Sequence, residues 1–415
     1  MSITLRASVA PTPAAVAPSP ATSPTVPVGA GAGALAYTYK RAPVPIVRGE
    51  GVTLIDADGK QYLDLASGIA VNALGYGDAG VKAAITTALE SGLIHTSNLF
   101  RTEPGEQLAA ALVAHSFADR VFFCNSGAEA NEGAFKFARK WARSIGSPAK
   151  HEIVSLRGAF HGRLFASVAA TDRPAYRLPF RPLAGGITIA ERDERELDAM
   201  LDAETVAAVI VEPIQGEGGV RVIEPGLLAY LRRITKERRI ALIFDEIQCG
   251  LGRTGHLFAY EGTGQVPDMV TLAKPIAGGL PMGAILLSEE VASALEPGEH
   301  GTTFGGGPLV ASVALHVFER LSNPALLAHV REVGEWLGRR LHATMERSAK
   351  VRAVRGTGFM WGMDVVDPAA EVVARARDAG ILILSAGDHT LRLLPPLVMS
   401  QADLEVALGR LDGVL

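Results

Sequence analysis

Lys274 is the residue of this sequence whose type and surroundings point most directly to chemistry. It ends an apolar run that begins at Thr271, and a proline and paired glycines follow it. A lysine in such surroundings is poorly hydrated, which disfavours the ammonium and leaves a neutral amine that can form a Schiff base. The alternative is a lysine at the end of a strand whose tip reaches water. Lys274 alone does not decide between the two.

Two acids, Asp245 and Glu246, follow the apolar run Ile240–Phe244 about one strand-to-strand step before Lys274. Asp245 can cap the next element, which is a common place for aspartate. It can also pair with a protonated heteroaromatic nitrogen, as a pyridoxal ring requires in order to act as an electron sink. Neighbouring strands would suit the nitrogen and the aldehyde carbon of such a ring.

A candidate phosphate site follows another predicted strand, in the segment Cys124–Glu129. Ser126 and Glu129 have the spacing of a capping box, and an apolar helical stripe comes after them. Gly127, beside Ala128, allows a phosphate to approach the backbone at the helix N-terminus. A helix cap without any ligand is the alternative.

Several further side chains have a functional and a purely structural interpretation. Phe160 could stack on a flat ring, and Arg163 could bind a carboxylate with its planar fork. Glu217, in a glycine-rich loop, could screen an arginine. Arg392 lies inside an apolar run, so that it needs an anion if it is buried. The structural alternatives are core packing for Phe160, and side chains in water for Arg163, Glu217 and Arg392.

A second glycine-rich segment, from His300 to Gly307, contains Thr302 and Thr303. Its hydroxyl and backbone donors suit a phosphate, although the segment can also be no more than a flexible loop.

The elements that must position these residues follow an alternating pattern. Short apolar strands alternate with helical stretches, which indicates an α/β fold with a mostly parallel sheet covered on both faces. The predicted strands are Arg120–Phe123, Glu152–Ser155, Val206–Glu212, Ile240–Phe244 and Met269–Leu272. Ligands of such sheets bind at the carboxyl ends of the strands, and most of the residues above follow strand ends.

Two further patterns frame this sheet. Thr53–Asp56 and Gln61–Leu65 flank an Asp-Gly pair and predict a hairpin. Apolar residues at helical spacing from Leu309 to Leu321 predict a long helix that leads into a smaller α+β domain. We expect a large domain over residues 75–310, and a small domain built from residues 38–74 and 311–415.

The composition is that of an ordinary globular protein. The 415 residues suffice for two domains, and the net charge of −4 offers no basic face for nucleic acid. Two cysteines are too few for a disulfide framework or a zinc cluster, so that we predict no metal site and a reducing compartment. No apolar run approaches the about 20 residues that a membrane span needs.

Residues 1–37 differ from the rest and predict a disordered leader. Pro11–Val28 is rich in Pro, Ala, Ser and Thr and carries no charge. A transit segment for an organelle is the alternative, but the leader has only one early arginine, Arg6, and no amphipathic periodicity. The glycines of Gly29–Ala34 loosely match a dinucleotide-binding loop; because no strand precedes them, we interpret them as a linker.

Taken together, the segments from Tyr39 to Leu415 resemble the class III, ornithine-type aminotransferases. These are fold-type I enzymes that use pyridoxal 5'-phosphate. Six separate segments occur in the order and spacing of that family. Gly68–Gly75, Asn98–Phe100 and Val211–Val220 are similar to the acetylornithine aminotransferase subfamily.

The resemblance implies a set of cofactor contacts. Lys274 would bind the cofactor aldehyde and carry the proton once it is displaced. Asp245 would bind the ring nitrogen, Gln248 the ring hydroxyl, and Phe160 would stack on the ring. Ser126–Ala128 would hold the phosphate.

The resemblance also implies a homodimer and a set of substrate contacts. Thr303 would reach the phosphate from the neighbouring subunit, and Thr302 would contact the substrate. Arg163 would take the distal carboxylate of the substrate, and Arg392 the proximal carboxylate of glutamate or 2-oxoglutarate. Glu217 would cover Arg392 when a substrate without that carboxylate is bound.

The reaction implied is transfer of the δ-amino group of N2-acetylornithine to 2-oxoglutarate, in arginine biosynthesis, by a cytoplasmic enzyme. Alternatives are an ω-aminotransferase for ornithine, succinylornithine, succinyldiaminopimelate or 4-aminobutyrate, a pyridoxal-binding regulator, and a nicotinamide oxidoreductase. The regulator lacks a helix-turn-helix or basic segment, and the oxidoreductase rests on the leader glycines alone. Pro275 and Arg101 depart from the usual pattern of the family and leave the substrate preference open.

Overall fold

The computed structural model describes residues 35–146 and 148–415. Contacts divide the chain at Pro45, and every described helix and strand belongs to the unit Ile46–Leu415. The sequence predicts a disordered leader over residues 1–37. Residues 1–34, which include the Gly29–Ala34 segment, lie outside the described residues.

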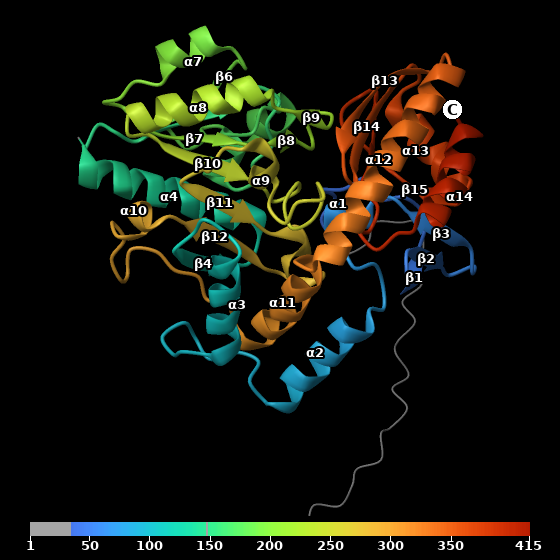
Figure 1. Ribbon diagram of the computed structural model, residues 1–415, viewed down its shortest axis with the longest axis horizontal. Coiled ribbons are helices and arrows are strands. Elements are labelled where there is room, and N and C mark those ends of the chain that lie inside the picture. The colour runs from blue at the N-terminus through green and yellow to red at the C-terminus, as the bar shows by residue number, and fades with distance from the viewer. Residues whose placement is uncertain (1–34, 147) are drawn as a thin grey trace, which may run out of the picture. The chain divides into compact units, whose positions relative to one another are not determined.

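The strands and helices alternate through most of the chain (Figure 1). The strands are β1 (Ile46–Glu50), β2 (Thr53–Asp56), β3 (Gln61–Asp64), β4 (Arg120–Cys124), β5 (Glu152–Leu156), β6 (Ile187–Ala190), β7 (Val206–Val211), β8 (Ile214–Gln215), β9 (Arg221–Val222), β10 (Ala241–Asp245), β11 (Met269–Leu272), β12 (Gly283–Leu287), β13 (Val351–Thr357), β14 (Met360–Val365), β15 (Ile381–Leu382), β16 (Leu384–Ser385) and β17 (Thr390–Leu393).

The α-helices are α1 (Ser67–Ala70), α2 (Ala79–Glu90), α3 (Glu103–Ala114), α4 (Gly127–Ile145), α5 (Phe165–Ala169), α6 (Pro174–Arg177), α7 (Glu194–Met200), α8 (Pro225–Glu237), α9 (Ala259–Thr263), α10 (Glu289–Ala292), α11 (Pro308–Leu321), α12 (Pro324–Arg347), α13 (Ala369–Asp378) and α14 (Gln401–Asp412). Two 3₁₀ turns are η1 (Leu178–Phe180) and η2 (Lys274–Ala277).

A seven-stranded sheet in the order β4-β12-β11-β10-β7-β5-β6 forms the centre of the fold. All five predicted strands are present in it, with ends that differ from the prediction by at most one residue. The pairs of β10 with β11 and β7, and of β5 with β7 and β6, are parallel. The predicted fold class, α/β with a mostly parallel sheet, is therefore confirmed.

Two strands of this sheet were not predicted, β6 and β12. The second is antiparallel to both of its neighbours, β11 and β4. An apolar strand shows its burial in the sequence but not its direction, because direction depends on where the chain returns to the sheet.

Both faces of the central sheet are buried, which explains why its strands are continuously apolar. Along β10, Ala241 and Ile243 pack into the cluster that contains the apolar face of α4, while Leu242 and Phe244 pack into the larger cluster on the other side. Successive side chains of a strand point to opposite faces, so that a sheet covered on both sides selects apolar residues at every position.

Smaller sheets join segments that are far apart in the sequence. The predicted hairpin is confirmed as β2 and β3, and β3 pairs in parallel with β15. A second four-stranded sheet has the order β13-β14-β17-β16, and Figure 1 shows α12, α13 and α14 beside it. The pairing of β3 with β15 joins the segments 38–74 and 311–415 in one sheet. It supports our proposal of a small domain built from these two segments, with residues 75–310 as the large domain.

The predicted helix from Leu309 is α11, which begins at Pro308. Proline is favoured at the first position of a helix because its missing N–H would have no partner there. Figure 1 shows α11 running beside α2 and α3 and leading to α12. Within residues 35–146 and 148–415, no helix is long and apolar enough to cross a membrane.

Candidate active site

A cavity of about 400 Å³ lies at the carboxyl ends of the central strands. Its lining comes mainly from segments that follow β4, β5, β7, β10 and β11, as expected for a doubly covered parallel sheet. The predicted site residues in its lining are Ser126, Gly127, Ala128, Phe160, Arg163, Asp245, Gln248 and Lys274. Segments separated by more than a hundred residues thus meet in one place.

Lys274 occupies a strained position at the start of η2. Its φ is +33°, in the region that a residue with a Cβ rarely adopts. Such strain costs about 1–3 kcal/mol and gathers at functional sites. Burial lowers the pKa of the Lys274 amine, and the Arg392 charge lowers it further, whereas Asp245 and two glutamates act in the opposite direction. The direction of this shift is the one that the sequence predicts.

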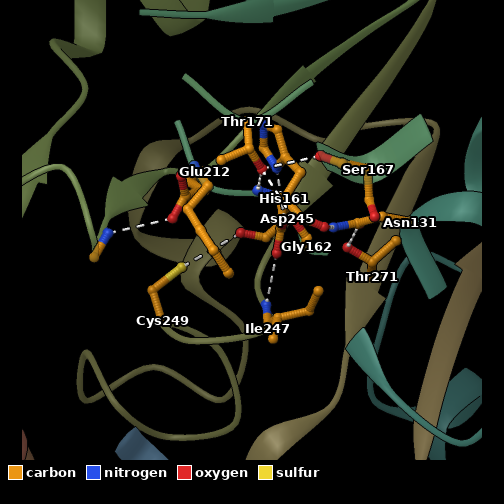
Figure 2. A network of polar contacts seen from close by, with 12 residues as sticks. Asn131, His161, Gly162, Ser167, Thr171, Glu212, Asp245, Ile247, Cys249 and Thr271 are labelled. Carbon is orange, nitrogen blue, oxygen red and sulfur yellow. Dashed lines mark hydrogen bonds and ion pairs between the residues drawn. The ribbon is translucent and has the colours of Figure 1, made fainter. Parts of the chain in front are cut away.

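Asp245, the last residue of β10, is buried in a network of polar contacts (Figure 2). Its Oδ2 accepts a hydrogen bond from Asn131 Nδ2 at 2.8 Å and lies 2.8 Å from His161 Nδ1. Its Oδ1 accepts a hydrogen bond from the Ile247 amide at 3.1 Å. The carboxylate is thus held in one orientation at the wall of the cavity.

The N-terminus of α4 faces the cavity as the sequence predicts. Ser126 is the N-cap, and its Oγ accepts a hydrogen bond from the Glu129 amide at 3.2 Å. The carboxylate of Glu129 reaches past the N-cap to the Asn125 amide, at 2.8 Å. The Gly127 and Ala128 amides belong to the first helical turn, where no intrahelical acceptor exists. Two donors at the positive end of a helix dipole suit an anion.

Phe160 and Arg163 follow β5 and line the cavity together. The Arg163 guanidinium lies 3.4 Å from the ring centroid of Tyr176, in α6, and 5.8 Å from that of Phe160. The two rings meet edge to face at 6.3 Å. A cation packed on aromatic faces is held in place while its N–H edges stay available for a carboxylate.

Arg392 is buried in β17 and forms an ion pair with Glu217 at 2.7 Å. Its second terminal nitrogen donates to Gln248 Oε1 at 3.1 Å. Arg392 therefore has the anion that the sequence led us to expect, supplied by this chain. Gln248 joins this pair to the cavity, because its own side chain lines the wall.

Thr302 and Thr303 lie outside this cluster. Thr302 Oγ1 accepts a hydrogen bond from Asn125 Nδ2 at 3.2 Å, so that it lies beside the phosphate-facing segment. Thr303 is exposed and is absent from the cavity lining. One chain therefore does not bring Thr303 to its own site.

Two ionisable residues near the cavity, Glu212 and His161, were not predicted. Glu212 follows β7, lines the cavity and accepts hydrogen bonds from the Phe160 amide at 2.8 Å and the Gly216 amide at 3.2 Å. Burial raises the pKa of the Glu212 carboxyl to about 7. The sequence offered a signal for both residues, because Glu212 stands directly after an apolar strand and His161 stands beside Phe160.

These donors and acceptors fit a phosphorylated pyridine aldehyde such as pyridoxal 5'-phosphate. The amides at the start of α4 suit the phosphate, Phe160 offers a flat apolar surface, and Asp245 offers an acceptor for a ring N–H. Gly127 also approaches Ile247 so closely that a Cβ would lie 2.8 Å from its side chain. The cavity wall is therefore closely packed between the positions that would hold the phosphate and the ring.

Comparison with known proteins identifies aminotransferases as relatives, in agreement with a site that fits pyridoxal 5'-phosphate. The family described as Aminotransferase class-III matches residues 34–415. The acetylornithine aminotransferase of Methanocaldococcus jannaschii is 43% identical over 374 residues, which cover 90% of this chain and 94% of that protein. The mitochondrial acetylornithine aminotransferase of Alnus glutinosa is 45% identical over 372 residues, covering 88% and 82%.

Solved structures give the same family. N-acetylornithine aminotransferase from Stenotrophomonas maltophilia superposes with a TM-score of 0.80 at 38% identity, covering 91% of this chain and 96% of that one. An ornithine aminotransferase from Toxoplasma gondii, with partial occupancy of PLP at its active site, has a TM-score of 0.86 at 30% identity, covering 91% of this chain and 92% of that one. This chain therefore belongs to the class-III aminotransferases, which are transaminases that depend on pyridoxal phosphate.

Proposed function

We propose that this enzyme transfers the δ-amino group of N2-acetylornithine to 2-oxoglutarate, giving N-acetylglutamate 5-semialdehyde and glutamate. The observation that carries the proposal is the ion pair of Arg392 with Glu217 beside the Lys274 cavity, with Arg163 also in the cavity wall. The acetylornithine aminotransferases among its relatives support the choice of amine donor.

Pyridoxal 5'-phosphate, when bound, supplies an aldehyde that accepts the amine and a ring that withdraws electrons from the adjoining carbon. We assign the phosphate to Ser126, Gly127 and Ala128, because the first turn of α4 offers free amide donors there. Phe160 packs on the ring, and Gln248 hydrogen-bonds the ring hydroxyl.

Lys274 and Asp245 carry the proton chemistry in this proposal. The Lys274 amine has a lowered pKa, so that its neutral form would be available to hold the cofactor aldehyde with loss of water, and Nζ, once displaced by the substrate amine, would take and return a proton. The Asp245 carboxylate accepts the N–H of the ring and keeps that nitrogen protonated. Pro275, directly after the lysine, is buried, and its ring fixes φ at its own position in the turn that Lys274 begins.

Arg163 and Arg392 divide the recognition of the two substrates. Arg163 binds the carboxylate that lies far from the reacting amine, and Thr302 adds a contact to the substrate. With 2-oxoglutarate, Arg392 binds the second carboxylate and Glu217 moves away. With acetylornithine, which has no carboxylate there, Glu217 neutralises Arg392 as it does in the structure.

The enzyme in this proposal is a homodimer with a shared active site. Apolar side chains of the 94–100 and 302–304 segments are exposed, with Leu99 at 89%, Phe100 at 71% and Phe304 at 65%. The two segments touch, since Asn98 Nδ2 donates to the Thr302 carbonyl at 2.8 Å. Such a patch supports a protein interface, at which Thr303 would reach the phosphate site of a second copy.

We also propose a cytoplasmic location for the enzyme. Cys124 and Cys249 are both free and buried, as is usual in a reducing compartment. Import into an organelle by residues 1–37 is the alternative, and one relative is itself named as mitochondrial.

A panel of amine donors tests the proposed reaction. The purified enzyme, loaded with pyridoxal 5'-phosphate, is offered N2-acetylornithine, ornithine, succinylornithine, succinyldiaminopimelate and 4-aminobutyrate with 2-oxoglutarate as acceptor. We expect kcat/KM to be highest for N2-acetylornithine. A higher value for another donor would reassign the substrate and leave the transaminase chemistry intact. No turnover with any donor would contradict the reaction class.

A further inference from the structure

Asp245 is oriented by a side chain that takes no part in the lining of the cavity. Asn131, in the second turn of α4, is completely buried. Its Nδ2 donates both to Asp245 Oδ2, at 2.8 Å, and to the main-chain oxygen of His161, at 2.7 Å (Figure 2). An amide group is thus inserted between α4, β10 and the segment that follows β5.

The orientation of the Asn131 amide is determined by its partners. The main-chain oxygen of His161 can only accept a hydrogen bond, so the NH₂ group must face it. The amide oxygen then points to Thr271, whose Oγ1 donates to it at 2.8 Å. Thr271 is also completely buried. The hydroxyl therefore locks the amide with its donors toward Asp245.

The register of β10 with β11 places Thr271 where its hydroxyl can donate to the Asn131 amide oxygen. Thr271 is the partner of Asp245 in the parallel pairing of β10 with β11, and its main-chain oxygen accepts from the Glu246 amide at 3.0 Å. It also stands three residues before Lys274 in the chain. One chain of hydrogen bonds thus connects the strand that leads to the lysine with the carboxylate.

The hydrogen bonds leave one acceptor position of Asp245 open. Asn131 and His161 together fill Oδ2, since a carboxylate oxygen offers about two acceptor positions. Among the described residues, Oδ1 accepts a hydrogen bond only from the Ile247 amide, at 3.1 Å. Oδ1 therefore has the free lone pair, on a carboxylate that lines the cavity.

We propose that Asn131, held by Thr271, is a positioning residue that directs Oδ1 of Asp245 toward the ring nitrogen of pyridoxal 5'-phosphate. Neither side chain is in the cavity lining, so that both act through Asp245. This inference rests on the proposed function in one respect, the pairing of Asp245 with the ring nitrogen. It adds which oxygen is used and which residues hold it.

The test compares two ligands that differ only at the ring nitrogen. Apoenzyme is titrated with pyridoxal 5'-phosphate and with its analogue in which a C–H group replaces that nitrogen, and each dissociation constant is measured by absorbance. Thr271→Val keeps the shape of the side chain and removes the hydroxyl. Asn131→Asp removes both N–H donors and sets a second carboxyl against Asp245.

We expect Thr271→Val to weaken the binding of pyridoxal 5'-phosphate by about 3- to 10-fold, and Asn131→Asp by about 10- to 100-fold. The affinity for the analogue should change less than about threefold in both, because it has no ring N–H for Asp245 to accept. Thr271→Ser keeps the hydroxyl and should bind both ligands as the unmodified enzyme does.

Each other outcome has a separate meaning. Equal losses for both ligands would show a general packing role and overturn the proposal, as would no loss for either. Circular dichroism of the apoenzyme shows whether Asn131→Asp folds. If it does not fold, the comparison of the two ligands in Thr271→Val tests the proposal alone. If the unmodified apoenzyme binds both ligands equally well, the pairing of Asp245 with the ring nitrogen is itself wrong. If it discriminates but the variants keep that preference, only the role of Asn131 and Thr271 is wrong.

Discussion

In the proposed function, Glu217 and Arg392 are the two side chains that let one cavity accept unlike substrates. Their 2.7 Å ion pair neutralises a buried guanidinium whenever the substrate brings no carboxylate of its own. Leaving one charge of such a pair without its partner is costly. We therefore expect the pair to open only for a substrate that replaces the Glu217 carboxylate with another.

Replacing Glu217 by Gln should change substrate preference. Arg392 is then free for a carboxylate with glutamate, but carries an unneutralised charge with acetylornithine. We expect the ratio of kcat/KM for glutamate to that for acetylornithine to rise by about 10-fold. The two half-reactions, followed separately by absorbance, measure this ratio. Glu217→Asp retains the charge and serves as the control; an unchanged ratio in Glu217→Gln would contradict the exchange of carboxylates.

The same substitution should alter the pH at which the apoenzyme takes up its cofactor. The pKa of Lys274 is lowered by burial and by Arg392, and the Glu217 charge partly offsets this. Without that carboxylate the ammonium loses a stabilising partner, so its pKa falls further. Because the neutral amine attacks the aldehyde, the uptake rate should reach its plateau at lower pH. Stopped-flow uptake measured over a range of pH checks this, and a shift to higher pH would refute it.

At the scale of single residues, the sequence points to the proposed ligand contacts more clearly than to the residues that hold them in position. Lys274, Asp245 and Arg392 could be recognised because charged groups stand at the ends of, or inside, apolar strands. Asn131 and Thr271 carry no charge and look like ordinary polar residues in a helix and a strand. Their meaning depends on the register of β10 with β11 and on the depth of α4, which only the folded chain defines.

The elements are held together at places where two backbones approach closely. Gly334, in α12, lies against the turn between β13 and β14, and a Cβ there would be 2.7 Å from Gly358 Cα and from its carbonyl oxygen. A backbone cannot withdraw as a flexible side chain does. The glycine is thus required for this helix to pack on its sheet.

Gly334→Ala should destabilise the enzyme by about 1–3 kcal/mol through overpacking. Gly409 offers a matched control, because it lies in α14 and a Cβ added there would meet no neighbouring atom within 4 Å. Gly409→Ala should stabilise the chain by about 0.5–1 kcal/mol, since alanine favours the helix. Unfolding in urea compares the two. A Gly334→Ala variant as stable as the unmodified enzyme would refute the close packing.

Element type could be predicted where the hydrophobic pattern was strong. The five predicted strands and α11 are present within one residue of their predicted ends. The direction of β12 and the stacking of Tyr176 from α6 on Arg163 could not be predicted, because both depend on tertiary contacts. A turn of four residues such as α6 leaves no periodic signal.

The whole molecule brings remote segments together but leaves Thr303 away from its own cavity. Thr303 is exposed beside Phe304, next to an apolar surface. The proposed dimer explains both facts, since a partner would cover the apolar side chains and receive Thr303. The family resemblance implied this arrangement; the composition of the chain did not.

Mixed dimers test the shared site. Lys274→Ala removes the amine, and Thr303→Asp places a negative charge where the phosphate binds, so that each variant alone should be inactive. When equal amounts are co-expressed, half of the dimers are mixed and each has one intact site if Thr303 acts across the interface. We expect about a quarter of the full activity. No recovery in verified mixed dimers would place Thr303 in its own subunit's site, whereas an active Thr303→Asp variant would place Thr303 outside both sites.

The most direct test of the central claim is to locate the lysine that carries the cofactor. The enzyme loaded with pyridoxal 5'-phosphate is reduced with borohydride and digested, and the peptides are mapped by mass. The account predicts a phosphopyridoxyl group on Lys274, absent from the Lys274→Ala variant. Attachment to another lysine of the unmodified enzyme would contradict the assignment of this cavity as the active site.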